Sequence, residues 1–203
     1  MKIKGLEKIC GLYFLSGRDA SGVRRIDNNG PVEIPTLRAM KSRRQPPGPG
    51  DPLFTQRLTN PYGAPVSIKT ARKATAAAIA EGKKNGWTVA VAVVDPGGVL
   101  VYFERMDGTQ TASSDVAIEK ARTAVAFKRS TKLFENGIVA GRLQNLGLPG
   151  ALPIDGGVPL IEDGRIVGAI GVSGAQPEQD GVCVKAAIDA LAGEKTGNKS
   201  KET

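Results

Sequence analysis

The sequence of 203 residues contains no histidine. Histidine is the commonest metal ligand in proteins and the usual base of nucleophilic triads. Its absence excludes imidazole ligation of zinc or haem iron and every histidine-dependent mechanism for the isolated chain. Cysteine is almost as scarce, since only Cys10 and Cys183 are present. Two such cysteines do not make a disulfide framework, and we expect both thiols to be reduced.

Long hydrophobic runs are absent as well. The longest aliphatic run covers residues 89–94, whereas a membrane helix needs about 20 apolar residues. We therefore predict no membrane span. A short apolar stretch at residues 9–15 follows three lysines and loosely resembles a signal peptide, but no clean cleavage site follows it. We expect a cytoplasmic protein, with secretion as the alternative.

Basic residues outnumber acidic ones, 28 to 20, which raises the hypothesis of nucleic-acid binding. Most of the excess lies in residues 1–65, which hold eleven basic and five acidic residues, whereas residues 66–193 hold fourteen and thirteen. The N-terminal segment also lacks a helical or strand period, and QPPGPG at 45–50 is typical of a linker. We predict a basic, largely disordered arm over residues 1–65, one domain over 66–193 and a polar tail over 194–203. The neutral domain argues against a nucleic-acid partner, and a docking role for the arm stays open.

Apolar residues recur at helical spacing in three places. Ser67 is the expected N-cap of a first helix that ends near Asn85. A second helix follows Ser114 and has an alanine-rich apolar face, which favours close packing against a sheet. A third helix is expected to begin at Pro177 and to end at Gly193.

Turn residues between β-rich runs predict two β-hairpins. The first joins residues 87–94 to 99–103 through DPGG, and the second joins 158–161 to 165–172 through EDG. A short helix and a loop are expected within residues 130–154. Four strands in two hairpins, with flanking helices, predict an α/β (α+β) fold in which helices cover an antiparallel sheet.

Five blocks of sequence, in order, resemble the GlcG/HbpS-like family. They are VVDPGG at 93–98, ERMDG at 104–108, KARTA at 120–124, GGVP at 156–159 and GAIGVSG at 168–174, followed by Gln179 and Asp180. The resemblance implies a profilin-like sandwich that forms dimers and higher oligomers. It also implies relatives that bind haem and relatives that are fused to a corrinoid adenosyltransferase.

Some haem-binding relatives of the family supply a histidine to the iron, and this chain has none. If haem is the cofactor here, its ligand must be Met106, a tyrosine, Cys183 or a hydroxyl, or no protein atom at all. The resemblance therefore implies a small-molecule-binding homo-oligomer that takes haem or another anionic organic ligand without histidine ligation.

Binding residues are expected where the second strand runs into a polar loop, at Arg105, Met106 and Asp107. Arg105 offers a bidentate contact to a carboxylate or propionate, and an internal ion pair with Asp107 is the alternative. No metal site is predicted.

Further binding candidates flank the second helix and the second hairpin. Ser113 and Ser114 precede the helix, where hydroxyls and free N–H groups receive an anion or simply cap the helix. Gly156, Gly157 and Ser173 flank the hairpin, where glycines allow a ligand to approach the backbone or serve turn geometry alone.

The alternative function is an enzyme, such as an isomerase, tautomerase or lyase, that acts on a small organic acid. Its candidate acid–base groups are Asp107, Lys120 and Asp180. Burial would lower the pKa of Lys120, although an exposed lysine is the commoner case. Asp180 and Glu178 also complement the positive end of the third helix, which explains them without catalysis. Whether the protein is an enzyme stays open.

Overall fold

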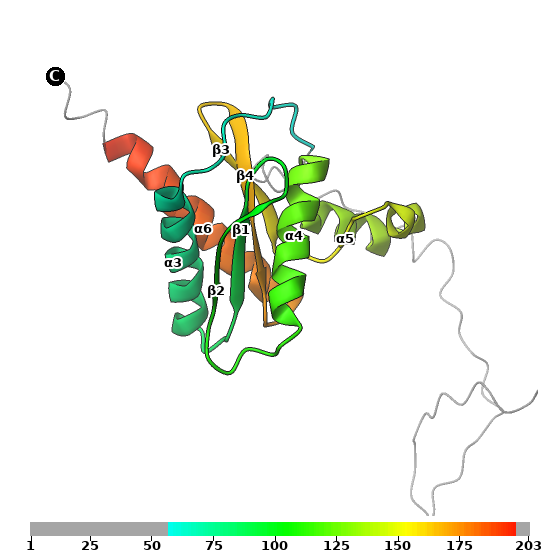
Figure 1. The fold of residues 1–203 in the computed structure, drawn as a ribbon. Coiled ribbons are helices and arrows are strands. Elements are labelled where there is room, and N and C mark those ends of the chain that lie inside the picture. The colour runs from blue at the N-terminus through cyan, green and yellow to red at the C-terminus, as the bar shows by residue number, and fades with distance from the viewer. Residues whose placement is uncertain (1–56, 198–203) are drawn as a thin grey trace, which may run out of the picture. The chain divides into compact units, whose positions relative to one another are not determined.

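The computed structural model describes residues 57–197. The expected disorder of residues 1–56 and the last part of the polar tail lie outside the described residues. The helices and strands, in chain order, are α3 (Ile68–Lys84), β1 (Ala90–Val94), β2 (Leu100–Arg105), α4 (Ser113–Phe127), α5 (Thr131–Val139), the 3-10 helix η1 (Leu143–Gly147), β3 (Gly157–Glu162), β4 (Arg165–Ser173) and α6 (Pro177–Gly197) (Figure 1).

The four strands form one antiparallel sheet in the order β2-β1-β4-β3. Each predicted hairpin is present, and β1 pairs with β4 to join the two. The first turn is fixed by Asp95, whose Oδ1 accepts hydrogen bonds from the N–H groups of Gly97 and Val99 at 2.8 and 2.9 Å. The second turn uses positive φ at Asp163 and Gly164. The prediction of an α+β fold built from two hairpins is confirmed.

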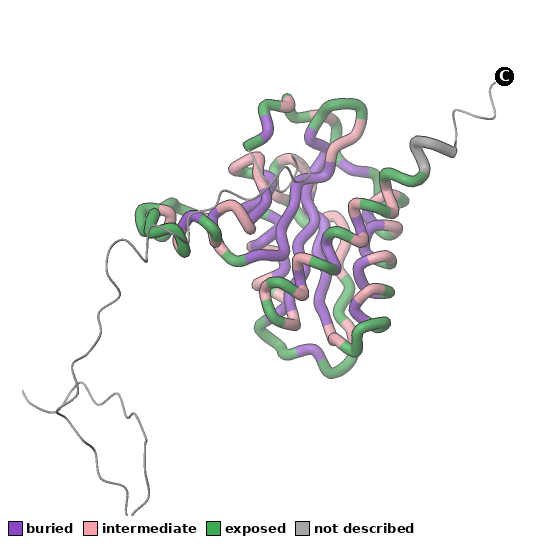
Figure 2. The backbone as a smooth tube through the Cα atoms, turned by 180° about the vertical axis from the view of Figure 1, so that it is seen from behind, coloured by how far each residue is buried: buried purple, intermediate pink, exposed green. Residues whose placement is uncertain are grey.

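Helices cover both faces of the sheet. In Figure 1, α3 and α6 lie against one face and α4 lies against the other. Val91 and Val93 of β1 join the main core, whereas Ala90 and Ala92 pack with Ala117 of α4. Burial is concentrated in β1, β3 and β4, which are largely purple in Figure 2, whereas β2 at the edge of the sheet is only partly buried.

The alanine-rich face of α4 lies very close to the sheet. A Cβ atom at Gly171 of β4 would overlap the carbonyl oxygen of Ala117, so only glycine fits at this position. The close packing expected from the alanines of this helix is thus present.

The chain joins the sheet earlier than residue 66, the expected start of the domain. Leu58 is buried, and its N–H donates to the carbonyl of Lys128 at 2.8 Å. Tyr62 forms a bridge with Ile166, and its hydroxyl donates to the carbonyl of Val125 at 2.9 Å. These contacts, which no local sequence pattern reveals, hold residues 58–63 against β4 and the end of α4.

The ends of α3 and α6 agree with the sequence at three of four points. Ser67 caps α3 by accepting from the N–H of Thr70 at 3.0 Å, and Asn85 ends it. Pro177 begins α6, but Gly193 does not end it, because the helix continues to Gly197. A single glycine costs a helix only about 1 kcal/mol, which does not stop it without a suitable turn behind it. None of the helices in residues 57–197 combines the length and apolarity that a bilayer crossing needs.

Candidate functional site

Several predicted binding residues meet at one end of the sheet. Ala90 of β1 pairs with Arg105 on one side and with Ser173 on the other. Neighbouring strands are about 4.8 Å apart, so the Cα atoms of Arg105 and Ser173 lie about 10 Å from each other. Directly paired residues point to the same face, which here is the face covered by α4, because Ala90 packs with Ala117.

Two other candidates lie at the same end. Gly157 pairs with Gly171, two residues before Ser173. The loop after β2 leads into the start of α4 at this end, which brings Ser114 there (Figure 1). We call Arg105, Ser114, Gly157 and Ser173 the sheet-end site.

Arg105 and Asp107 are both exposed. Within residues 57–197, the ion pairs and side-chain hydrogen bonds include none between them, and neither side chain has another polar partner. The alternative of an internal Arg105–Asp107 ion pair is therefore wrong. The guanidinium of Arg105 keeps its five N–H donors available to a ligand.

Met106 turns away from this exposed loop. It is half-buried and packs against the main core, and its sulfur accepts the N–H of Val89 at 3.5 Å. Its side chain is therefore part of the packing that connects the end of β2 to the start of β1.

The other candidate iron ligands in the described chain are engaged too. The Cys183 thiol is fully buried, and desolvation raises its pKa to about 11. The hydroxyl of Tyr62 donates to Val125 at 2.9 Å, and that of Tyr102 donates to Glu104 at 3.2 Å. Met106, Cys183, Tyr62 and Tyr102 thus do not fit axial ligation of haem iron. The described residues also contain no cluster of three or more acidic or cysteine side chains that could hold a metal ion.

The predicted serine cap of the second helix is wrong. The helix begins at Ser113 itself, and its N-cap is Ala112, which makes no side-chain hydrogen bond. The N–H groups of Ser113 and Ser114 donate to the carbonyls of Gln110 and Thr111 at 3.1 and 3.3 Å. Because these donors are occupied, the start of α4 offers an anion fewer N–H groups than an open helix end does.

Two buried hydroxyls in this region have no hydrogen-bond partner in the described structure, Thr109 Oγ1 and Ser113 Oγ. Both precede or open α4, and unsatisfied buried hydroxyls are uncommon in folded proteins. Sequence reasoning missed Thr109, because a threonine in a polar loop carries no signal of burial.

Lys120 and Asp180 form a buried ion pair beside the sheet-end site. Lys120 Nζ lies 2.8 Å from Asp180 Oδ2 and 3.0 Å from the Val172 carbonyl oxygen, and the two side chains are only 1% and 2% exposed. Asp180 Oδ1 also accepts the N–H of Ala175 at 3.1 Å. Burial raises the pKa of Asp180, although the Lys120 ammonium opposes that shift.

The expectation of an exposed Lys120 is wrong for a tertiary reason. The side chain leaves α4, passes the glycines that begin β3, and reaches the first turn of α6. A Cβ atom at Gly156 would lie 3.0 Å from Lys120 Nζ, so the glycine leaves room for the ammonium. The pair therefore ties α4 on one face of the sheet to α6 on the other.

A second group of charged residues contains Asp155, Lys132 and Glu135. Asp155 is nearly buried, its carboxylate lies 3.3 Å from Lys132 Nζ, and its N–H donates to Glu135 Oε2 at 2.7 Å. Burial raises the pKa of Asp155, against the attraction of Lys132. The sequence did not indicate a role for Asp155, although it directly precedes the candidate residues Gly156 and Gly157.

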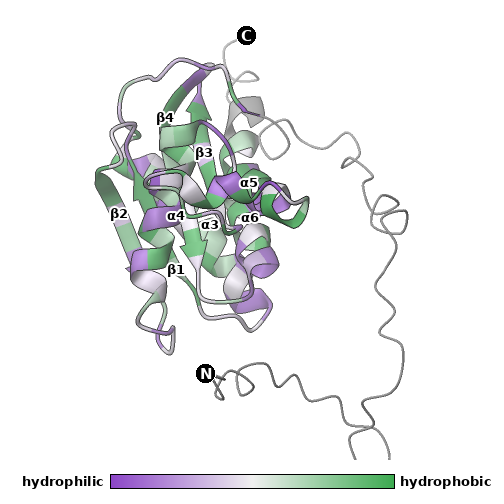
Figure 3. Ribbon diagram, turned by 90° about the vertical axis from the view of Figure 1, so that its right-hand side faces the viewer, coloured by the Kyte–Doolittle hydropathy of each residue, from purple (hydrophilic) through white to green (hydrophobic). Residues whose placement is uncertain are grey.

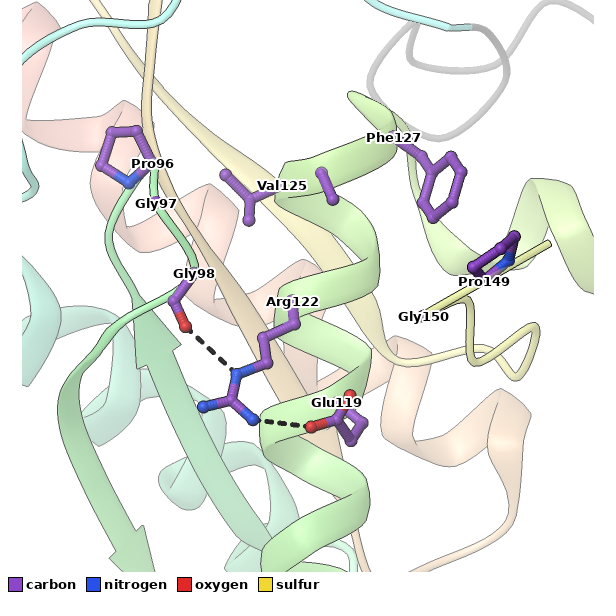
Figure 4. A pocket seen from close by; sticks show the side chains of 10 residues that line it. Pro96, Gly97, Gly98, Glu119, Arg122, Val125, Phe127, Pro149 and Gly150 are labelled. Atoms are coloured by element: carbon purple, nitrogen blue, oxygen red, sulfur yellow. Dashed lines mark hydrogen bonds and ion pairs between the residues drawn. The ribbon is translucent and has the colours of Figure 1, made fainter.

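The described chain has a surface cavity of about 340 Å³ at the other end of β1 (Figure 4). It lies between the β1–β2 turn, α4 and the Pro149–Gly150 segment, and Arg122 and Glu119 stand in it. None of the predicted site residues lines this cavity.

Comparison with known proteins covers most of the described fold. A family model described as haem degrading protein HbpS-like matches residues 66–189. The protein GlcG of Escherichia coli K12 is 42% identical over 93 residues, which cover 46% of this chain and 69% of GlcG.

Solved structures give the same result. A crystal structure of HbpS is 34% identical, with a TM-score of 0.57, and the match covers 64% of this chain and 92% of that one. The haem complex of PduOC is 29% identical, with a TM-score of 0.56, and covers 63% and 95%. Since one family model matches well over half of its residues, the chain belongs to the HbpS-like family.

Proposed function

We propose that this protein binds a small anionic organic molecule at the sheet-end site. The observation that carries the proposal is the position of Arg105, an exposed guanidinium without a polar partner in the described chain, across Ala90 from Ser173. A free guanidinium binds a carboxylate through two parallel N–H···O bonds. The half-buried hydroxyl of Ser114 supplies a further contact. Ser173 is only 6% exposed, and Gly157 is buried with its N–H donating to Thr131 Oγ1 at 2.9 Å, so neither reaches the ligand directly.

The haem complex of PduOC supports a role in small-molecule binding, because that relative shares the fold and holds an organic anion. Haem fits our proposal through its propionates alone. Met106, Cys183 and the two described tyrosines are buried or already hydrogen-bonded. We therefore expect recognition of carboxylates and not of the metal.

The enzyme alternative gains no support from the geometry. A general acid or base must come within hydrogen-bond reach of its substrate. Lys120 and Asp180 are buried and paired with each other, so neither side chain reaches a substrate, and Asp107 lies on an exposed loop. Catalysis by these three groups stays a prediction.

We also propose that the protein is a homo-oligomer. Large apolar side chains are exposed along the segment from the end of α5 to the start of β3, with Val139 83% and Leu146 64% exposed. In the ribbon of Figure 3, hydrophobic colour appears in and next to α5. Large exposed apolar side chains that gather in one segment often mark a protein interface, and a second copy is the partner that the family resemblance implies.

The binding proposal is tested with hemin and with iron-free protoporphyrin IX, which carries the same two propionates. We expect both to bind with similar affinity, and Arg105→Gln to weaken both about tenfold, or about 1.4 kcal/mol. Arg165→Gln, an exposed arginine at the other end of β4, is the matched control and should bind like the unmodified chain.

Binding of hemin without protoporphyrin would point to iron ligation and overturn the proposed mode. Equal binding by Arg105→Gln would remove the sheet-end site. Failure of both porphyrins to bind would exclude this class of anion. The oligomer is tested separately by native mass spectrometry of Leu143→Ser and Leu146→Ser, which we expect to shift the protein toward the monomer.

A further inference from the structure

We propose a second ligand site on the outer face of α4, at the end of β1 opposite the sheet-end site. Its ligand is a small molecule whose head group combines a carboxylate with an N–H donor, on a short apolar body. The site is the cavity of about 340 Å³ in Figure 4, which we call the α4 groove. Its volume lies at the lower end of the range for ligand pockets, about 300–1,000 Å³, and therefore suits a small ligand.

Arg122 supplies the donors of the α4 groove. Its Nε–H donates to the carbonyl of Gly98 at 3.1 Å, and its Nη1 donates to Glu119 Oε1 at 2.7 Å. A guanidinium has five N–H donors, so three remain without a partner among the described residues. The two existing bonds fix the plane of the guanidinium, as the dashed lines in Figure 4 show, and leave its free edge to a carboxylate.

Glu119 supplies the acceptor. Only Oε1 is used by Arg122, and Oε2 has no partner among the described residues. The two charges cancel, so the groove has no net attraction for a simple anion. A head group with a carboxylate next to an N–H donor satisfies both side chains, whereas a ligand with a carboxylate alone is attracted by Arg122 but repelled by Glu119.

The remaining walls are apolar or lack side chains. Val125, Phe127 and Pro149 line the groove, and the Phe127 ring is held edge-to-face against Phe134, with centroids 5.3 Å apart. A small aromatic or aliphatic body can pack on such a fixed ring.

Hydrogen bonds hold the Pro149–Gly150 side of the groove to α4. Thr123 of α4 is fully buried, and its Oγ1 accepts the N–H of Leu152 at 2.8 Å and donates to the carbonyl of Gly150 at 3.3 Å. This contact attaches the Pro149–Gly150 segment to α4, so the ligand need not order a loop when it binds.

The α4 groove is separate from the sheet-end site. The groove starts at the turn after Val94, whereas Arg105 and Ser173 pair with Ala90. The four residue steps between Ala90 and Val94 span about 13 Å of strand. One variant at each end therefore distinguishes the two proposals.

The test is a titration followed by amide NMR of the full chain, with three probes of the same size. L-Phenylalanine carries both head-group functions, 3-phenylpropionate carries only the carboxylate, and phenethylamine carries only the ammonium. We expect L-phenylalanine to shift the amides of Gly97, Gly98 and Gly150 saturably, and the two other probes to bind at least about fivefold more weakly.

The variants decide which residues are responsible. Arg122→Gln, at an exposed position, is expected to keep the fold and lose the response, and Glu119→Gln to lose the preference for L-phenylalanine over 3-phenylpropionate. Arg105→Gln should respond like the unmodified chain. The proposal is overturned by the absence of saturable shifts at the three glycines, by equal binding of all three probes, or by an unchanged response in Arg122→Gln. None of these outcomes depends on porphyrin binding.

Discussion

Lys120 Nζ and Asp180 Oδ2 lie 2.8 Å apart with both side chains almost fully buried, although the two residues are 60 positions apart in the sequence. The pair connects the helices on the two faces of the sheet. Gly156 and Gly157 are packed against Lys120 of this pair.

Removing one partner of this pair should be costly. Lys120→Met leaves the Asp180 carboxylate buried without its counter-charge, and we expect a loss of about 3–5 kcal/mol in the free energy of unfolding by urea. The double variant Lys120→Met with Asp180→Asn should recover part of that loss, because no buried charge remains. Lys185→Met breaks an exposed pair with Asp189 and should cost less than about 0.5 kcal/mol. A similar cost for both lysines would contradict the structure.

Asp155 gives a pH dependence of known sign. Burial raises its pKa above the ordinary 3.8, with Lys132 in opposition. The folded chain therefore binds the proton of the Asp155 carboxyl more tightly than the unfolded chain does. Protonated Asp155 contributes its full stabilisation at pH values below its pKa in the unfolded chain, and this stabilisation is lost as the pH rises through its pKa in the folded chain. Asp155→Asn cannot ionise, and its stability relative to the unmodified chain should increase with pH in this window.

Urea unfolding at about pH 3.5, 5 and 7 measures this difference. Asp189→Asn, with a side chain that is 61% exposed, is the control and should show no such trend. A relative stability of Asp155→Asn that falls with pH would show that the attraction of Lys132 outweighs burial.

Two glycines should respond to alanine in opposite ways. Gly156 has φ +114°, and an added Cβ would lie 2.7 Å from the Val172 carbonyl oxygen and 3.0 Å from Lys120 Nζ. We expect Gly156→Ala to cost at least about 2 kcal/mol. Gly193 lies in α6 with nothing near its Cβ position, so Gly193→Ala should be neutral or add up to about 1 kcal/mol. Thermal unfolding of both variants is the measurement.

Cys183 should be inert in the folded protein. Burial raises the pKa of its thiol to about 11, so almost no thiolate exists at neutral pH. In a Cys10→Ser background, we expect no labelling by iodoacetamide at about pH 8 without urea and complete labelling once the chain unfolds. Rapid labelling of the folded chain would mean that the α6 side of the core opens locally.

The hairpins and the helices were predictable from the sequence because their signals are local. The DPGG turn is fixed by Asp95 bonding to residues two and four positions ahead, and the EDG turn by residues with positive φ. The N-cap at Ser67 likewise bonds within four residues. The resemblance blocks also placed Arg105, Ser173 and Gly157 among the candidates, and the sheet brings these three to one end.

The sequence by itself determined the two turns, the three main helices, the exclusion of histidine chemistry and the identity of the candidate residues. The tertiary structure decided the burial of Lys120, the role of Asp155, the loss of the serine cap at α4, and the separation of the sheet-end site from the α4 groove. The reason is physical. Turns and helical faces depend on neighbours along the chain, whereas burial and pairing depend on residues such as Asp180 that only the folded sheet brings near Lys120.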